Sequence, residues 1–303
     1  MAETKPNYLD PQILNKVGRL ELRARYVVEG FVSGMHQSPY KGSAVEFAQH
    51  REYVQGDDIR YIDWKIYGKT DRIYIKEFEE ETNLRAHLFV DRSESMAYGH
   101  DDGMNKFDYA ATACASLAFM IQQQADAVGL NLFAEELITS IPPSNTRGNL
   151  GNILGALEGA TPNDGTKIGE TLQKLAARLP QRGMVMVFSD LFDEADSVLA
   201  GLAARGRRGH DVVVFHTLDR DEIEFPFERM TMFEGLESMP DLLADPRGLR
   251  EAYLQEIGAF NEKIRKGCLA QRIDYVRLET NQPLDVVLSS FLAARAARNK
   301  ARK

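Results

Sequence analysis

The stretch that decides the fold is AHLFVDRSESM, residues 86–96. Its first five residues are mostly apolar, which is typical of a strand buried on both faces of a parallel sheet. Asp91 ends this run, and the hydroxyl side chains of Ser93 and Ser95 follow at alternate positions. On its own, the pattern fits either a capped helix after the strand or a group of oxygen ligands for a cation.

A second apolar run ends in the same way. MVMVFSD, residues 184–190, closes with Asp190. In open α/β sheets, ligands bind outside the carboxyl ends of the strands, at the point where the strand order reverses. Asp91 and Asp190 would therefore face one crevice if their strands are neighbours. Hydroxyl oxygens with only two carboxylates suit Mg2+ or another hard divalent cation better than zinc. Because hydroxyls are neutral, they leave residual positive charge on the metal, which would attract an anionic ligand from outside.

Thr166 lies between these two acids, in NDGTKIGETL, residues 163–172, just before a predicted helix. Its role as an ordinary helix cap is common. The ordered set of Asp-x-Ser-x-Ser, then Gly-Thr before a helix, then Asp after a buried strand resembles the metal-ion-dependent adhesion site of von Willebrand factor A domains. The resemblance implies a ligand set of Asp91, Ser93, Ser95, Thr166 and Asp190. Many such domains have Gly where this chain has Leu191, a departure that concerns the shape of the loop.

Strands and helices alternate from residue 85 onward. This order predicts a doubly wound, mostly parallel α/β sheet of Rossmann type over residues 85–303. Residues 221–237 alternate in the manner of an inserted β-hairpin. The predicted strands are residues 86–91, 127–134, 136–141, 184–190, 211–218 and 273–279, and the main helices lie between them.

Residues 1–84 are expected to form an N-terminal α+β extension. Apolar spacing predicts an amphipathic helix over residues 11–31. A capping box at Ser43 and Glu46 predicts a helix that runs to Gly56, and residues 72–82 alternate like a strand.

Residues 43–81 closely resemble the signature of the family catalogued as Domain of Unknown Function 58. The resemblance extends from about residue 15 to the final helix. We favour an ion-pair and capping network for the charged residues of this run, and a binding surface stays the alternative. The matching positions are Arg51, Tyr53, Gly56, Asp57, Asp58, Arg60, Ile62, Asp63 and Trp64.

Composition limits the classes of function. A net charge of -8 argues against non-specific binding of nucleic acid. The two cysteines are far apart in sequence and fit a reducing compartment. We see neither a signal peptide nor an apolar run of membrane-spanning length, so a cytoplasmic protein without a membrane span is expected.

Enzymatic signatures are weak in this chain. Gly68-Lys69-Thr70 lacks the earlier glycine of a phosphate-binding loop, and no Gly-x-Ser-x-Gly elbow is present. We therefore expect a protein that is not an enzyme. A Mg2+-dependent phosphoryl-transfer or hydrolytic enzyme that uses the same carboxylates is the alternative, and capped loops without any metal are a third possibility.

The family resemblance also implies a partner. Members are typically encoded beside MoxR-type AAA+ ATPases, which implies an adaptor or co-chaperone in complex assembly or cofactor insertion. We expect an acidic side chain of this ATPase or of its client to complete the coordination of the cation. The sequence does not identify the client or the oligomeric state.

Overall fold

The computed structural model describes residues 11–37, 50–52, 68, 73–76, 84–100, 103–163, 165, 167–179, 183–206, 209–235 and 240–301. The chain divides into two compact units, residues 1–34 with 84–303, and residues 35–83. The expected grouping of residues 1–84 differs from this division. Leu14, Leu20 and Val27 are buried in the core of the larger unit, which is why the first helices belong to it.

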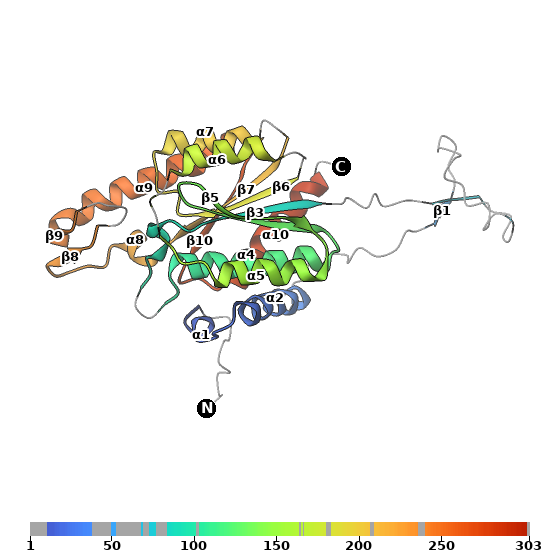
Figure 1. The fold of residues 1–303 in the computed structure, drawn as a ribbon, viewed down its shortest axis with the longest axis horizontal. Coiled ribbons are helices and arrows are strands. Elements are labelled where there is room, and N and C mark those ends of the chain that lie inside the picture. The colour runs from blue at the N-terminus through green and yellow to red at the C-terminus, as the bar shows by residue number, and fades with distance from the viewer. Residues whose placement is uncertain are drawn as a thin grey trace, which may run out of the picture. The chain divides into compact units, whose positions relative to one another are not determined.

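A six-stranded sheet forms the centre of the larger unit (Figure 1). The strand order is β10-β7-β6-β3-β4-β5, with β5 antiparallel to β4 and the other pairs parallel. Numbered along the chain, these strands have the order 3-2-1-4-5-6, which is that of the Rossmann fold. The predicted doubly wound, mostly parallel sheet is therefore confirmed. The strands are β3 (Arg85–Asp91), β4 (Ala127–Phe133), β5 (Leu137–Ser144), β6 (Met184–Ser189), β7 (Asp211–Leu218) and β10 (Asp274–Glu279).

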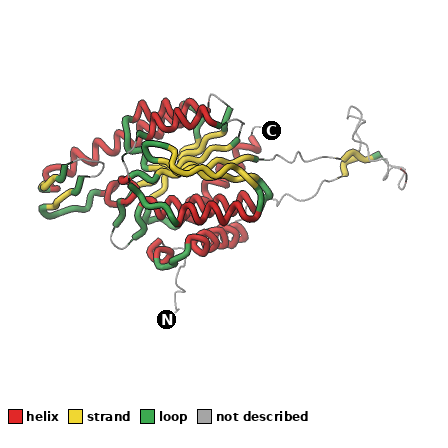
Figure 2. Tube along the Cα trace, viewed as in Figure 1, coloured by secondary structure: helices red, strands yellow, loops and turns green. Residues whose placement is uncertain are grey.

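Helices cover both faces of this sheet (Figure 2). One face is covered by α4, α5 and α10, with α2 in a further layer outside α4 and α5, and the other face is covered by α6, α7 and α9 (Figure 1). These helices are α2 (Leu20–Gln37), α4 (Lys106–Gln123), α5 (Arg147–Glu158), α6 (Ile168–Arg178), α7 (Ala195–Gly206), α9 (Pro246–Ala270) and α10 (Leu284–Ala301).

The two helical layers explain why the central strands are continuous apolar runs. Every residue of β6 is buried. Met186 and Phe188 point into the core beneath α4, whereas Val185 and Val187 point into the core beneath α6 and α7. Alternate side chains of one strand thus enter opposite cores, so neither face tolerates a polar stripe.

The insertion between β7 and α9 differs from the expected hairpin. Residues Arg220–Glu224 form the short helix α8, because Asp219 and Glu222 make a capping box at its start. The antiparallel strand pair follows later, with β8 (Thr231–Phe233) against β9 (Leu242–Ala244). The prediction of a hairpin within residues 221–237 was therefore wrong in its bounds.

Two predictions near the N-terminus also need correction. The helix expected from Ser43 to Gly56 is wrong at residues 50–52, which form strand β1 (His50–Glu52). This strand pairs antiparallel with β2 (Tyr74–Lys76), which lies within the strand predicted at residues 72–82. Pairing with a distant β-prone segment outweighs the local helical pattern here.

The predicted first helix is broken. Residues Pro11–Asn15 form α1, and α2 begins only at Leu20. Gly18 lies in the break between them, where its backbone freedom disfavours a continuous helix.

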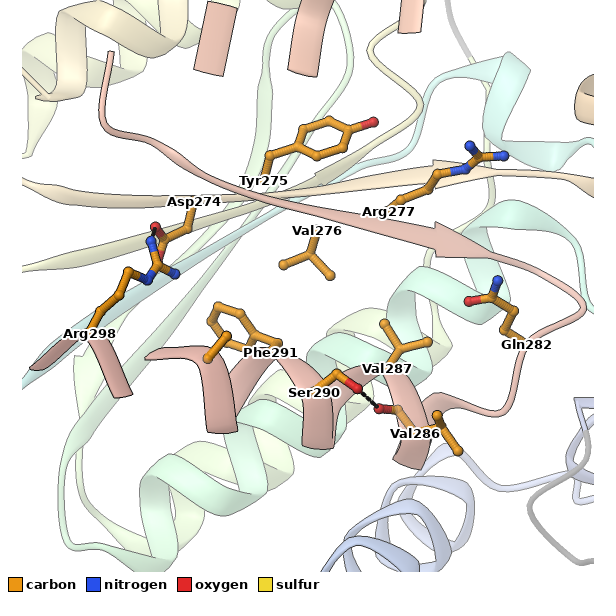
Figure 3. Close-up of a pocket in the computed structure, with 11 residues that line it drawn as sticks. Asp274, Tyr275, Val276, Arg277, Gln282, Val286, Val287, Ser290, Phe291 and Arg298 are labelled. Carbon is orange, nitrogen blue, oxygen red and sulfur yellow. Dashed lines mark hydrogen bonds and ion pairs between the residues drawn. The ribbon is translucent and has the colours of Figure 1, made fainter. Parts of the chain in front are cut away.

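A cavity of about 390 Å3 lies between the edge strand β10 and helix α10 (Figure 3). Val276 of the strand and Phe291 of the helix line it, and Arg298 bonds to Asp274 at its margin. Its lining shares no residue with the predicted cation site. Among the described helices, none is both long and apolar enough to cross a membrane.

Candidate cation site

The two strands that end in the predicted acids are neighbours. β3 and β6 pair in parallel, so their carboxyl ends lie at the same edge of the sheet. The strand order reverses between them, and this is the position where open α/β sheets place ligands. Asp91 is the last residue of β3 and Asp190 directly follows β6.

The loop after β3 directs its polar groups inward. The Ser93 amide donates to Asp91 Oδ1 at 2.9 Å, and the Ser93 and Ser95 hydroxyl oxygens are 3.1 Å apart. Ser93 occupies the N-cap position of the 3-10 helix Glu94–Ala97, but its side chain makes no capping hydrogen bond. The two hydroxyls therefore converge beside the carboxylates, which a simple cap would not require.

Asp91 is a fully buried carboxylate. The Ser189 hydroxyl donates to its Oδ2 at 2.6 Å. Burial, and then repulsion from Asp190, raise the pKa of Asp91 from 3.8 to about 7, although hydrogen bonds from Ser189 and Ser93 oppose the change. Within the described residues Asp91 forms no ion pair. Among the described residues, no lysine or arginine therefore balances the charge of Asp91 when it is ionised.

Asp190 has a different environment. The Lys106 ammonium donates to Asp190 Oδ2 at 2.7 Å, and the Phe192 amide donates to Oδ1 at 3.2 Å. Burial favours the protonated acid, but the charge and hydrogen bond of Lys106 outweigh it, and the Ser95 hydroxyl adds a further bond. The pKa of Asp190 is therefore lowered.

Lys106 also joins the site to the insertion. Its ammonium donates to Glu222 Oε1 at 2.6 Å, and Glu222 Oε2 accepts from the Asp219 amide at 2.8 Å. Burial lowers the pKa of Lys106, but Asp190 and Glu222 together outweigh burial and raise it, so the side chain stays charged.

His216 supports the Asp190 backbone. Burial lowers the pKa of this histidine to about 4, so its ring is neutral at pH 7. Nε2 lies 2.9 Å from the Asp190 carbonyl oxygen and Nδ1 lies 2.8 Å from the Tyr275 hydroxyl. A neutral ring that donates from Nε2 and accepts at Nδ1 satisfies both contacts, which leaves no ring nitrogen for a metal or a substrate.

Leu191 adopts a backbone conformation that favours glycine. Its φ is 56°, in the left-handed region, and its amide donates to the Ser189 hydroxyl at 2.9 Å. This backbone costs about 1–2 kcal/mol in a residue with a Cβ atom. The fully buried Leu191 side chain offsets that cost by packing in the core beneath α6 and α7.

Several predicted residues lie outside the described ones. Thr166 is among them, and its assignment as a ligand stays a prediction. Asn163, three residues earlier, donates its amide to the Arg92 carbonyl oxygen at 3.0 Å, so the same loop is tied to the β3 loop. Arg51 is described only as backbone in β1. Outside the described residues are also Asp57, Asp58, Arg60, Asp63 and Trp64.

The donor set fits a hard cation. Two carboxylates and two hydroxyls meet at one edge of the sheet, and oxygen is the ligand that Mg2+ prefers. No group of three or more His, Cys, Asp or Glu side chains in the described part of the chain could hold a metal. A cation at Asp91 would thus depend on the serine hydroxyls, which favours Mg2+ over zinc.

Sequence reasoning missed Lys106, Glu222 and His216. A signal was present for Lys106, because a cation in the first turn of a helix opposes the helix dipole and needs a specific partner. The spacing of Asp219 and Glu222 is that of a capping box and indicated α8. His216 looks like any polar residue in a buried strand, and we find no signal in its sequence context.

The sequence is similar to those of several known proteins. The profile of the family described as "Protein of unknown function DUF58" matches residues 49–263. An uncharacterised protein of Mycobacterium bovis and one of Mycobacterium tuberculosis are each 24% identical over 296 residues, covering 94% of this chain and 90% of the relative.

Solved structures with similar chains are more distant in sequence. The conserved hypothetical protein BatB from Bacteroides thetaiotaomicron has a TM-score of 0.48 at 19% identity, covering 71% of this chain and 99% of its own. An aerotolerance-related membrane protein from Bacteroides fragilis has a TM-score of 0.45 at 22% identity, with 67% and 96% covered. The VWA domain of SpRpn10 has a TM-score of 0.38 at 13% identity, with 68% and 93% covered.

Proposed function

The chain belongs to the DUF58 family, and from this premise we propose that it is a protein-binding adaptor whose binding depends on a divalent cation at Asp91. The observation that carries the proposal is the Asp91 carboxylate. It is completely buried at the switch point, beside two inward hydroxyls, and no described cation compensates its charge. A buried, uncompensated carboxylate is costly unless a cation or a proton neutralises it.

Mg2+ is the proposed ion, with Asp91, Ser93, Ser95, Thr166 and Asp190 as the proposed ligands. Hydroxyl ligands do not neutralise the ion, so an acidic side chain of a partner is a suitable further ligand. The proposed partner is a MoxR-type AAA+ ATPase or its client, in complex assembly or cofactor insertion. This part of the proposal is supported by family resemblance alone.

The insertion supports a role in protein binding. Four of its apolar side chains are more than half exposed, in and around the strand pair β8–β9. Clustered exposed apolar side chains are typical of surfaces that bind other proteins. The α8 end of this insertion contacts the β3 loop, where the Tyr98 hydroxyl donates to Asp221 Oδ2 at 3.4 Å. The four exposed residues are Met230, Met232, Leu242 and Leu243.

A capture experiment tests the proposal. The immobilised full chain is mixed with the purified MoxR-type ATPase of the same genome, in Mg2+ or in EDTA. We expect capture in Mg2+ by the wild type, loss in EDTA, and loss in Asp91→Ala. Asp196→Asn is the matched control, because Asp196 is an exposed carboxylate that pairs with Lys263.

Two results would contradict the proposal. If the ATPase is captured equally in EDTA and by Asp91→Ala, the ion is not needed for recognition of the partner. Mg2+-dependent turnover of a generic phosphoester, lost in Asp91→Ala and kept in Asp196→Asn, would favour an enzyme that uses the same carboxylates.

A further inference from the structure

Lys106 occupies an unusual position for a cation. It is the first residue of α4, directly after the N-cap Asn105, and its side chain is only 2% exposed. The helix dipole disfavours positive charge at this end. Its two carboxylate partners, Asp190 and Glu222, hold the ammonium there at 2.7 and 2.6 Å.

The backbone around Lys106 is also fixed. The Lys106 amide donates to the Tyr98 carbonyl oxygen at 2.8 Å. A Cβ atom on Gly99 would lie 2.4 Å from the Asn105 Cα atom, so only glycine fits this close approach. The start of α4 is thereby held against the β3 loop, and the ammonium is directed at the edge where Asp91 and Asp190 meet.

The charges at this edge impose a competition. The Lys106 ammonium lies between the carboxyl groups of Asp190 and Glu222, and Asp91 ends the strand next to the one that Asp190 follows. A divalent ion held by Asp91 and Asp190 would share Asp190 with the ammonium. Two cations at a buried carboxylate repel one another strongly, because little water screens them.

We propose that Lys106 is a tethered cation that competes with a divalent ion for Asp190, and that Glu222 of the inserted helix weakens this competition by sharing the ammonium. Glu222 is therefore a positioning residue for the cation site, although it lies on a different element. The insertion that carries the exposed apolar side chains then sets the affinity of the site through one ion pair. This inference rests on the proposed function only in taking Asp91 as the place where a divalent ion binds.

The test is calorimetric titration of the full chain with Mg2+ alone. Lys106→Gln removes the competing charge, so we expect Mg2+ to bind at least tenfold more tightly. Glu222→Gln leaves the ammonium to Asp190, so we expect binding several-fold weaker. Glu224→Gln is the matched control, since Glu224 is on the same helix and pairs with Arg220 at the surface. It should bind Mg2+ as the wild type does.

The double variant Lys106→Gln/Glu222→Gln separates the proposed mechanism from a general charge effect. Without an ammonium to release, Glu222→Gln should change the affinity less than it does alone, so the two effects should not add. Additive effects would overturn the role of Glu222. Unchanged or weaker binding by Lys106→Gln would overturn the role of Lys106.

Failure of this inference is distinguishable from failure of the proposed function. Mg2+ binding by Lys106→Gln but not by the wild type would support the tethered cation and overturn Mg2+-dependent binding by the native chain. Binding by neither would overturn both. Circular dichroism would show whether Lys106→Gln folds. If it does not, the Mg2+ affinities of Glu222→Gln and Glu224→Gln are compared instead, and equal affinities would overturn the inference.

Discussion

Asp91 and Asp190 end neighbouring strands, and both are buried, but their surroundings differ in charge. Asp190 has a lysine ammonium 2.7 Å away, whereas Asp91 has a hydroxyl and an amide. The pKa of Asp190 is lowered by its partner, and the pKa of Asp91 is raised to about 7 by burial and by Asp190. Among the described residues, a lysine neutralises only the strand end at Asp190, which is why we propose the Asp91 end as the place for an external cation.

Replacement of each acid by its amide should have very different effects on stability at the two strand ends. Asp190→Asn should destabilise the metal-free protein by about 3–5 kcal/mol, because it leaves a buried ammonium with half of its partners. Asp91→Asn should change the free energy of unfolding by less than about 1 kcal/mol, or raise it, since no cation loses a partner. Urea unfolding in EDTA measures both values. Equal losses would mean that the two carboxylates are equivalent after all.

The pH dependence of stability should differ between the wild type and Asp91→Asn. A carboxyl group whose pKa is raised on folding stabilises the folded state fully only below its unfolded pKa of 3.8, and that stabilisation is lost as the pH rises toward 7. The wild type should therefore lose about 2–3 kcal/mol relative to Asp91→Asn between pH 5 and pH 8 in EDTA. Parallel pH profiles of the two proteins, from urea unfolding, would contradict the raised pKa.

The affinity for Mg2+ should also depend on pH, because Asp91 takes up a proton. The ion and the proton compete for Asp91, so binding should be about tenfold weaker at pH 6 than at pH 8. Calorimetry in two buffers of different ionisation enthalpy should also detect proton release at pH 6 and little at pH 8.5. Affinity that is independent of pH would show that Asp91 is ionised before the ion arrives.

The smallest expected effect concerns the hydroxyl between the two strand ends. Ser189 donates to Asp91 and accepts from the Leu191 amide, so Ser189→Ala leaves that buried amide unpaired and should cost about 1 kcal/mol. Ser290→Ala is the control, because Ser290 bonds within the exposed part of α10. Chemical denaturation compares the two, and a loss no greater for Ser189→Ala than for the control would argue against a structural link between the loops.

The sequence was sufficient for the sheet and for the positions of the two acids. The short apolar runs that end in Asp91 and Asp190 are typical of strands buried between two helical layers, and residues 136–141 alternate as an edge strand does. The sequence left open whether β3 and β6 are neighbours, and the structure shows that they pair in parallel.

The features that the sequence did not reveal depend on contacts between segments that are distant along the chain. Lys106 meets Glu222 across 116 residues, and no local pattern encodes that pairing. Residues 221–237 alternate like a hairpin, but a single capping box at Asp219 converts their start into a helix and brings Glu222 to the ammonium. Strand β1 was missed for the same reason, since its partner β2 is more than twenty residues away.

Anomalous diffraction from crystals grown with Mn2+ in place of Mg2+ tests whether a divalent cation binds at Asp91. We expect one strong peak at the carboxyl edge of the sheet, in contact with Asp91 and with the Ser93 and Ser95 hydroxyls, and no such peak in crystals of Asp91→Asn. A wild-type crystal at millimolar Mn2+ without a peak at this edge, or with the peak retained in Asp91→Asn, would contradict it.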